Sequence, residues 1–367
     1  MPRDLSHIII ADEVRSRLPQ PAARDVADNE AAFHMGAIAV DSFLYGSSST
    51  LATRLHGGLG DDTRDPVLAM LDDARAERDP ETAAAKRAFA FGYLTHVGTD
   101  IAYHPMVYSM SGSQAKENNL SQLGIDRAKA RHRFIETWID RDLMDKRGLS
   151  FDTFKPLKKI RTSDKFRPLC DFFAGNVEKA LGLDDSVKDT FRRSMRVQIL
   201  IGRVTQSQPL RKLLDRLDRA LDGKLKLATS GFYRTNRTLP KPMKEMTSFV
   251  HPVTGEVVHK NLDDLHKDAV ANATRLVLFA REYLRTGDRE AFKKSVKNVN
   301  LDTGVENTLL KDVTKTHEVP LKDLIGEKVA KFMEKTGIKR FSCGVKAKME
   351  KTNAAVMKRL GDIKRAR

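Results

Sequence analysis

The chain has 367 residues, with 65 Lys or Arg against 49 Asp or Glu, and a formal net charge of +16 at pH 7. This length allows one large domain or two smaller ones, and the charge favours anionic partners such as phosphate esters, nucleic acid or acidic lipid headgroups. The only two cysteines, Cys170 and Cys343, exclude a disulfide framework and a cysteine zinc site. No apolar run reaches membrane-spanning length and no secretory signal pattern is present, so we expect a soluble, cytoplasmic protein.

The first predicted helix, residues 5–18, has apolar residues spaced for one helix face and is followed by two prolines that end it. His7 lies near its start, where a histidine is either a solvated helix-start residue or a ligand. The next apolar segment, residues 33–46, carries a single carboxylate, Asp41, near its end. A buried carboxylate needs a strong partner, so Asp41 is an N-cap in a turn, a metal ligand or a catalytic base. His34, in the same segment, is expected only to pack in the core or at its rim.

A loop rich in Ser, Gly and Asp is predicted for residues 47–64. His56 in this loop is followed by two glycines, which let the backbone pass close to another group. A histidine there suits a ligand that approaches from outside the helices. A plain surface loop is the simpler explanation when His56 is considered alone.

A longer helix carries the most informative pattern, because His96, Asp100 and His104 lie at positions i, i+4 and i+8. Residues four apart are neighbours on one helix face, so these side chains line a single stripe about two turns long. Apolar residues surround the stripe, and polar groups that face a core need partners. The stripe suits a zinc ion; the alternative is three ordinary polar residues on a half-exposed helix.

A further helix, predicted over residues 128–140, repeats the pattern with His132 and Glu136 four residues apart. The two side chains could bind one ion, or they form an exposed pair worth roughly a few tenths of a kcal/mol. Each piece is weak alone, but together they form an ordered series of first-row metal ligands. The candidate ligands are His7, Asp41, His56, His96, Asp100, His104, His132 and Glu136.

The order and context of these residues resemble the zinc-dependent phospholipase C family, which includes secreted bacterial phospholipases C and many shorter relatives. The similar stretches are residues 1–14, 35–45, the loop at His56, 91–107 and 132–140, with a looser similarity that extends to about residue 285. Single-strand-specific zinc nucleases share this fold and a similar ligand series. The resemblance implies an all-α, multi-helix bundle with two or three zinc ions in a cleft between helices.

The resemblance also implies a ligand set for each ion. One ion would be bound by Asp41, His56, His96 and Asp100. A second would be bound by His104, His132 and Glu136. A third would share Asp100 and be bound by His7 and by the amine and carbonyl of the N-terminal residue. Secreted members expose an N-terminal tryptophan, whereas this chain offers Pro2 or Met1, so a two-zinc enzyme is the alternative.

The implied function is zinc-dependent hydrolysis of a phosphodiester, of the phospholipase C type. Such hydrolysis builds negative charge on the phosphoryl oxygens and the leaving alkoxide, which closely spaced zinc ions stabilise. We expect a zinc-bound hydroxide to attack phosphorus, with Asp41 orienting or deprotonating the water. The alternatives are a zinc nuclease or other phosphoesterase, which the positive charge favours, and a non-catalytic binding descendant of the fold.

The chain is predicted to divide into a helical domain, residues 1–290, with its metal site in residues 1–140, and a tail, residues 291–367. The end of the tail is rich in Lys and Arg, and its apolar residues have roughly helical spacing. Such a segment contacts an anionic membrane surface or nucleic acid, or it is a solvated basic helix or a disordered end. No obligate protein partner is inferred, and any contact with a membrane would be peripheral.

Overall fold

The computed structural model describes residues 4–331, except residues 47, 184–186, 211, 214–215, 217–237 and 328. This part of the chain is mainly helical, and its strands are limited to two hairpins with two-residue strands. The predicted all-α class is therefore confirmed. The basic end of the predicted tail, residues 332–367, lies outside the described residues.

The α-helices are α1 (Asp4–Arg15), α2 (Ala22–Asp28), α3 (Glu30–Ala39), α4 (Ser49–Leu55), α5 (Asp65–Ala76), α6 (Pro80–Ser111), α7 (Gln122–Lys146), α8 (Pro156–Thr162), α9 (Phe166–Leu181), α10 (Val187–Gln206), α13 (Lys241–Lys244), α14 (Leu262–Thr286), α15 (Arg289–Ser295) and α16 (Leu321–Ile325). Short 3-10 helices are η1 (Val40–Tyr45), η2 (Lys116–Asn118) and η3 (Leu310–Asp312). The strands β1 (Phe249–Val250) and β2 (Val257–Val258) pair antiparallel, as do β3 (Val299–Asn300) and β4 (Val305–Glu306).

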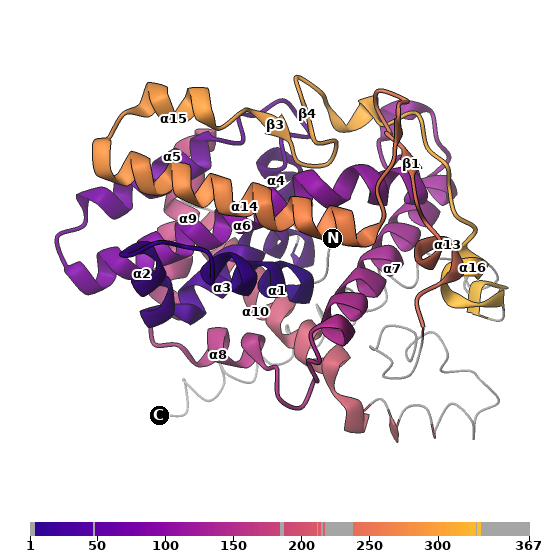
Figure 1. Cartoon of the computed structure of the whole chain (residues 1–367), viewed down its shortest axis with the longest axis horizontal. Helices are drawn as coiled ribbons and strands as arrows, with labels where there is room; N and C mark the ends of the chain where they lie inside the picture. The colour runs from indigo at the N-terminus through magenta and orange to yellow at the C-terminus, as the bar shows by residue number, and fades with distance from the viewer. Residues whose placement is uncertain are drawn as a thin grey trace, which may run out of the picture.

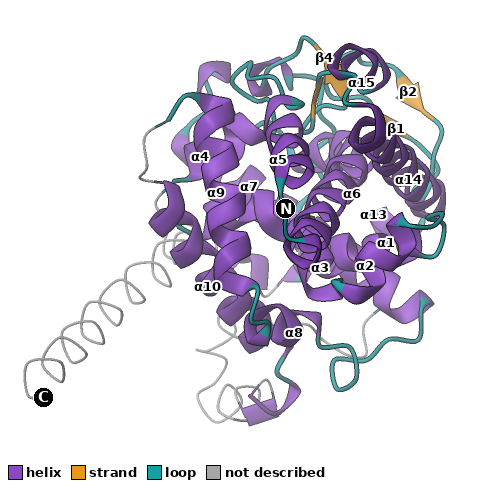
Figure 2. Ribbon diagram, turned by 90° about the vertical axis from the view of Figure 1, so that its left-hand side faces the viewer, coloured by secondary structure: helices purple, strands orange, loops and turns teal. Residues whose placement is uncertain are grey.

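Helix α6 is the axis of the fold. It begins after Asp79, whose side chain accepts a hydrogen bond from Thr82 N–H at 2.8 Å, and it ends at Gly112, which has a φ of 95°. Almost every side chain in residues 88–111 is buried. Helices α3, α5 and α14 pack around it, so that α6 lies in the middle of the bundle (Figure 2). Polar side chains in residues 88–111 of α6 are therefore shielded from water.

The backbones of α3 and α6 approach closely where two glycines lie in the contact. A Cβ atom added to Gly36 would lie closer than 3.0 Å to Phe89 O, and one added to Gly92 closer than 3.0 Å to Phe33 O. Gly98 allows a similar approach of the α14 backbone, which crosses α6 in Figure 1. Side chains larger than glycine would force these helices apart.

The chain beyond α14 folds back over the body formed by the earlier helices. Helix α15 and the β3–β4 hairpin lie above α14 in Figure 1. Main-chain hydrogen bonds then attach the chain to α6, from His317 N–H to Ser109 O and from Val319 N–H to Met110 O, each at 2.8 Å. The first part of the predicted tail thus packs on the helical body, and the domain boundary at residue 290 stays a prediction.

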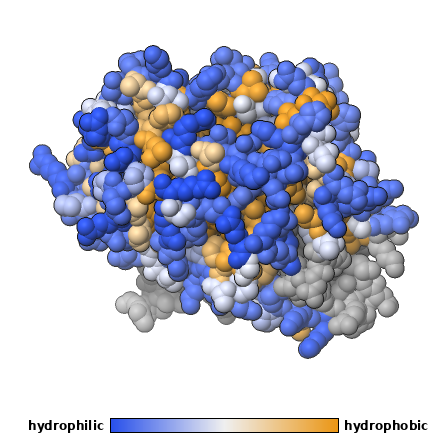
Figure 3. All heavy atoms as spheres, in the orientation of Figure 1, coloured by the Kyte–Doolittle hydropathy of each residue, from blue (hydrophilic) through white to orange (hydrophobic). Residues whose placement is uncertain are grey.

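Apolar side chains fill the interior, whereas hydrophilic ones predominate on the surface seen in Figure 3. Buried apolar side chains form one continuous cluster around α6. The face seen in Figure 3 is mostly hydrophilic, with apolar side chains scattered between charged ones. Of the helices that the structure describes, none is both long and apolar enough to cross a membrane.

The close crossing of α3 and α6 predicts that one added methyl group lowers the stability of the fold strongly. Gly92→Ala places a Cβ against main-chain atoms of α3, so we expect the free energy of unfolding to fall by ~3 kcal/mol. Gly175→Ala in α9 is the matched control, because its added Cβ would meet only Lys188 Cε, at 3.8 Å, and alanine is the better helix former. Urea denaturation followed by circular dichroism measures both variants. Equal stability of Gly92→Ala and the wild type would contradict the packing argument.

Candidate metal centre

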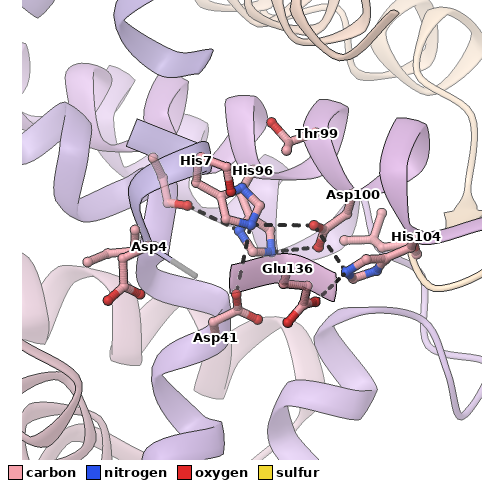
Figure 4. Close-up of polar contacts among 12 residues, drawn as sticks. Asp4, His7, Asp41, His96, Thr99, Asp100, His104 and Glu136 are labelled. Carbon is pink, nitrogen blue, oxygen red and sulfur yellow. Dashed lines mark hydrogen bonds and ion pairs between the residues drawn. The ribbon is translucent and has the colours of Figure 1, made fainter. Parts of the chain in front are cut away.

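Asp100 of α6 lies at the centre of a group of imidazole rings (Figure 4). Its carboxylate oxygens lie 2.9 Å from His96 Nε2, 3.2 Å from His56 Nε2, and 3.5 Å from both His7 Nε2 and His104 Nε2. His96 and His104 come from α6 itself, one turn before and one turn after Asp100, as the helical spacing predicts. The Asp100 side chain is 0% exposed, so its charge depends on these neighbours for stabilisation.

Asp41 and His7 join this group from other elements. His7 projects from α1, and its ring stacks on His96 with the ring centroids 4.2 Å apart. Asp41 lies in η1, directly after α3, with Oδ2 3.9 Å from His7 Nε2 and Oδ1 3.6 Å from His56 Nε2. The close contact between α3 and α6 therefore brings Asp41 to the polar stripe of α6.

A second group lies further along α6. His132 and Glu136 project from α7, with His132 Nε2 2.8 Å from Glu136 Oε1. His104 Nε2 of α6 lies 3.8 Å from the same Glu136 oxygen. His104 thus belongs to this group and also connects it to Asp100.

The eight candidate ligands from the sequence all lie in this cluster. Ligand atoms lie within 4.8 Å of one another in three groups, which are His7, His96 and Asp100; Asp41, His56 and His96; and His104, His132 and Glu136. The eight residues are between 0% and 6% exposed. The N-terminal amine and carbonyl expected at a third ion belong to residues 1–3, which lie outside the described residues. The role of the eight side chains as ligands stays a prediction, which this geometry makes testable.

The comparison with known families agrees with this arrangement. A model of the zinc dependent phospholipase C family matches residues 6–193 of the 367. The chain belongs to the zinc-dependent phospholipase C family. The resemblance inferred from the sequence is confirmed, and all eight candidate ligands lie within the matched range. No curated protein and no solved structure matches the chain.

The polar groups of this family member fit zinc in kind and in arrangement. Imidazole nitrogens and carboxylate oxygens are typical zinc ligands in proteins. Among the described residues, several buried atoms of the cluster have no hydrogen-bond partner, including both ring nitrogens of His7, Asp41 Oδ1, both Asp100 oxygens and His104 Nε2. Burying such atoms without partners costs free energy, and a bound cation would remove that cost.

Main-chain carbonyls orient two of the rings. His56 Nδ1 lies 2.7 Å from Ala52 O, and His96 Nδ1 lies 3.1 Å from Ala37 O. A hydrogen bond donated by Nδ1 fixes the tautomer whose Nε2 carries a lone pair. In the neutral ring that lone pair faces the cluster, as metal binding requires.

Burial and neighbouring charges shift the pKa values of the cluster in different directions. Burial alone would raise the pKa of Asp100, but the nearby histidines, His104 foremost, hold it well below its usual value. Burial and the charge of Asp100 raise the pKa of Asp41. Burial lowers the pKa of His7 and of His132 well below the usual value. These two imidazoles are therefore neutral near pH 7, which is the form that binds a metal ion.

Two further residues border the cluster and were not among the sequence candidates. Tyr108 lies one turn after His104 on α6, and its ring contacts the His132 ring edge-on, with the centroids 4.7 Å apart. Asp302 Oδ1 lies 3.4 Å from His104 Nδ1. The four-residue spacing of α6 could have found Tyr108. No local pattern could have found Asp302, because its contact is distant in the sequence.

His34, which was expected only to pack, has a polar partner. Its Nε2 atom lies 2.9 Å from Asp12 Oδ1, and the residue is 1% exposed. Asp12 and Glu30 lie close enough to His34 to resemble a metal site, but Arg15 is also 3.5 Å from Asp12 and 3.8 Å from Glu30. The guanidinium neutralises both carboxylates, so this group is a structural ion-pair network.

Zinc removal is expected to destabilise the protein. A ligand that binds only the native state stabilises it by mass action, which amounts to ~4 kcal/mol when free ligand is about 1,000 times its dissociation constant. Adding a chelator to the zinc-loaded protein should therefore lower the midpoint temperature of unfolding, measured by scanning calorimetry. The same chelator saturated with zinc is the control and should have no effect. An identical midpoint with and without the free chelator would mean that the cluster holds no ion.

Proposed function

We propose that the protein is a zinc-dependent phosphodiester hydrolase of the phospholipase C type. The observation that carries this proposal is the convergence of eight buried side chains with nitrogen or oxygen ligand atoms, Asp100 among them, from separate parts of the chain. Closely spaced zinc ions, when bound, polarise the phosphoryl oxygens and lower the pKa of a water molecule for attack on phosphorus. The side chains described above hold the ions, orient that water and shield the centre from solvent.

We infer two ions with at least three side-chain ligands each and a third that needs further ligands. His96 belongs to two of the three groups, but its single Nε2 lone pair can bind only one ion. Assigning His96 to the ion with Asp41 and His56 leaves His7 and a shared Asp100 for the third. Zinc is usually four-coordinate, so the third ion needs ligands beyond these two. The family resemblance supplies them from the N-terminal residue.

Asp41 is the residue to which we assign the role of general base. Its Oδ1 atom is buried and makes no hydrogen bond to a described residue, and burial raises its pKa. A carboxylate with a raised pKa accepts a proton more readily than an exposed aspartate does. It lies between His7 and His56, 3.9 and 3.6 Å from their Nε2 atoms, and we place the attacking water on this side of the cluster.

Asp41→Asn tests this assignment. The amide keeps the shape of the side chain but cannot accept the proton, so we expect kcat to fall by about 10²–10⁴-fold with the fold retained. Asp164→Asn is the matched control, because Asp164 is exposed and, among the described residues, accepts a hydrogen bond only from the adjacent Lys165 N–H. Zinc content, measured on the same samples by mass spectrometry, separates loss of the base from loss of an ion. Normal turnover at full zinc content would rule out the base role.

We propose a phospholipid as the substrate. The match of residues 6–193 to the zinc-dependent phospholipase C family supports this choice. A nuclease is the second candidate, since a net charge of +16 attracts a polyanion. The cytoplasmic location and the binding of membrane or nucleic acid by the basic tail stay predictions.

A substrate panel separates the two candidates. We expect the zinc-loaded protein to release phosphocholine from phosphatidylcholine vesicles, and to cleave bis-p-nitrophenyl phosphate, with both activities abolished by a chelator. Products are measured by mass spectrometry and by absorbance. Faster cleavage of single-stranded DNA than of lipid would favour the nuclease. No turnover of any of the three substrates would identify a non-catalytic descendant of the fold.

A further inference from the structure

The turn formed by residues 300–304 lies against the proposed metal centre. Leu301 N–H donates a hydrogen bond to His56 O at 2.8 Å, and Leu301 O lies 3.2 Å from His104 Nδ1. Asp302 follows, with Oδ1 3.4 Å from the same His104 nitrogen. This turn therefore contacts two of the candidate ligands, although it lies outside the range matched by the family model.

Internal hydrogen bonds and one glycine fix this turn on α6. Asn300 Oδ1 accepts a hydrogen bond from Asp302 N–H at 2.8 Å, and Gly304 N–H donates one to Asn300 O at 2.8 Å. Gly304 has a φ of +70°, and a Cβ atom there would lie 3.1 Å from Ile101 O of α6. Glycine thus permits both the backbone conformation and the close approach that bring Asp302 to His104.

Asp302 is a buried carboxylate with two polar partners at the centre. It is 6% exposed, and such a group needs hydrogen-bond donors. One is His104, and another is the hydroxyl group of Tyr108. Its Oδ1 atom faces Nδ1 of His104, on the side of the ring that points away from the cluster.

We propose that Asp302 is a positioning residue, which fixes and polarises His104 for metal binding. A carboxylate that accepts a hydrogen bond from the outer ring nitrogen makes the inner nitrogen a stronger ligand. The Leu301 carbonyl shares that ring nitrogen and fixes the tautomer, so the particular contribution of Asp302 is its negative charge. The proposal rests on the proposed function, because it requires His104 to bind zinc together with His132 and Glu136.

The test measures zinc affinity of the full chain by competition with a chromophoric chelator. Asp302→Asn keeps the size of the side chain and removes the charge. We expect one zinc ion per chain to bind about 10–100-fold more weakly, and the affinity of the remaining ions to be unchanged. A loss of about this size is typical when the hydrogen-bond partner of a metal-binding histidine is removed. Glu306→Gln is the matched control, with wild-type affinity expected. It lies in the same segment, pairs with Lys297 at 3.0 Å, and contacts no candidate ligand in the described structure.

The unfolding midpoint of the zinc-free proteins separates positioning from a general structural role. Zinc-free Asp302→Asn should have an unfolding midpoint close to that of the zinc-free wild type. Added zinc should raise the midpoint of Asp302→Asn less than it raises that of the wild type. A lower zinc-free midpoint with unchanged zinc affinity would overturn the proposal. If Asp302→Asn does not fold, Asp302→Ser removes the same charge with a smaller side chain that still accepts a hydrogen bond. Its zinc affinity should fall about 10–100-fold as well, and an unchanged affinity would overturn the proposal in the same way.

Failure of this proposal differs from failure of the proposed function. A wild-type protein that binds no zinc in the competition assay contradicts the function itself. A wild type that binds zinc, with Asp302→Asn binding equally tightly, contradicts only the role of Asp302.

Discussion

The buried charge of Asp100 is the feature on which the rest of the structure depends. The residue is 0% exposed, and four imidazole nitrogens approach its oxygens within 3.5 Å. A carboxylate in such a place is stable only with partners of opposite or adaptable charge. The helices are therefore arranged around a polar centre, and the apolar core packs outside it. A centre of this composition is suited to divalent cations.

The close contact between α3 and α6 holds that centre together. Gly36 and Gly92 remove the side chains that would separate the two backbones. The hydrogen bond between His96 Nδ1 and Ala37 O, at 3.1 Å, crosses the same contact. Asp41 follows α3 directly, so this contact sets its distance from the α6 histidines. Glycine within a helix lowers stability by about 1 kcal/mol relative to alanine. At these two positions, however, only glycine permits the close contact between the backbones.

How much of the site could be predicted from the sequence depends on where its residues lie. The helical repeat relates His96, Asp100 and His104, and likewise His132 and Glu136, because residues four apart on a helix must be neighbours. Spacing gives no such relation between separate elements. The family resemblance was needed to add His7, Asp41 and His56 to the same cluster, and the structure brings them there.

Long-range contacts mark the limit of sequence patterns. Leu301 reaches His104 across 197 residues of sequence, and Asp302 has only a turn of ordinary polar residues around it. The domain boundary predicted at residue 290 rests on composition alone. It does not reveal that the following chain returns to α6, because that return depends on the shape of the packed helices and on Gly304.

The contacts of Leu301 also bear on the order in which the protein matures. They join His56 O and His104 Nδ1 to a segment that the ribosome makes 197 residues after His104. At about 5–20 residues per second, translation of these residues takes ~10–40 s. Throughout that interval the nascent polypeptide holds His104 without the carbonyl and carboxylate that orient its ring. The proposed metal site therefore reaches its final geometry only late in synthesis, after most of the helices have left the ribosome.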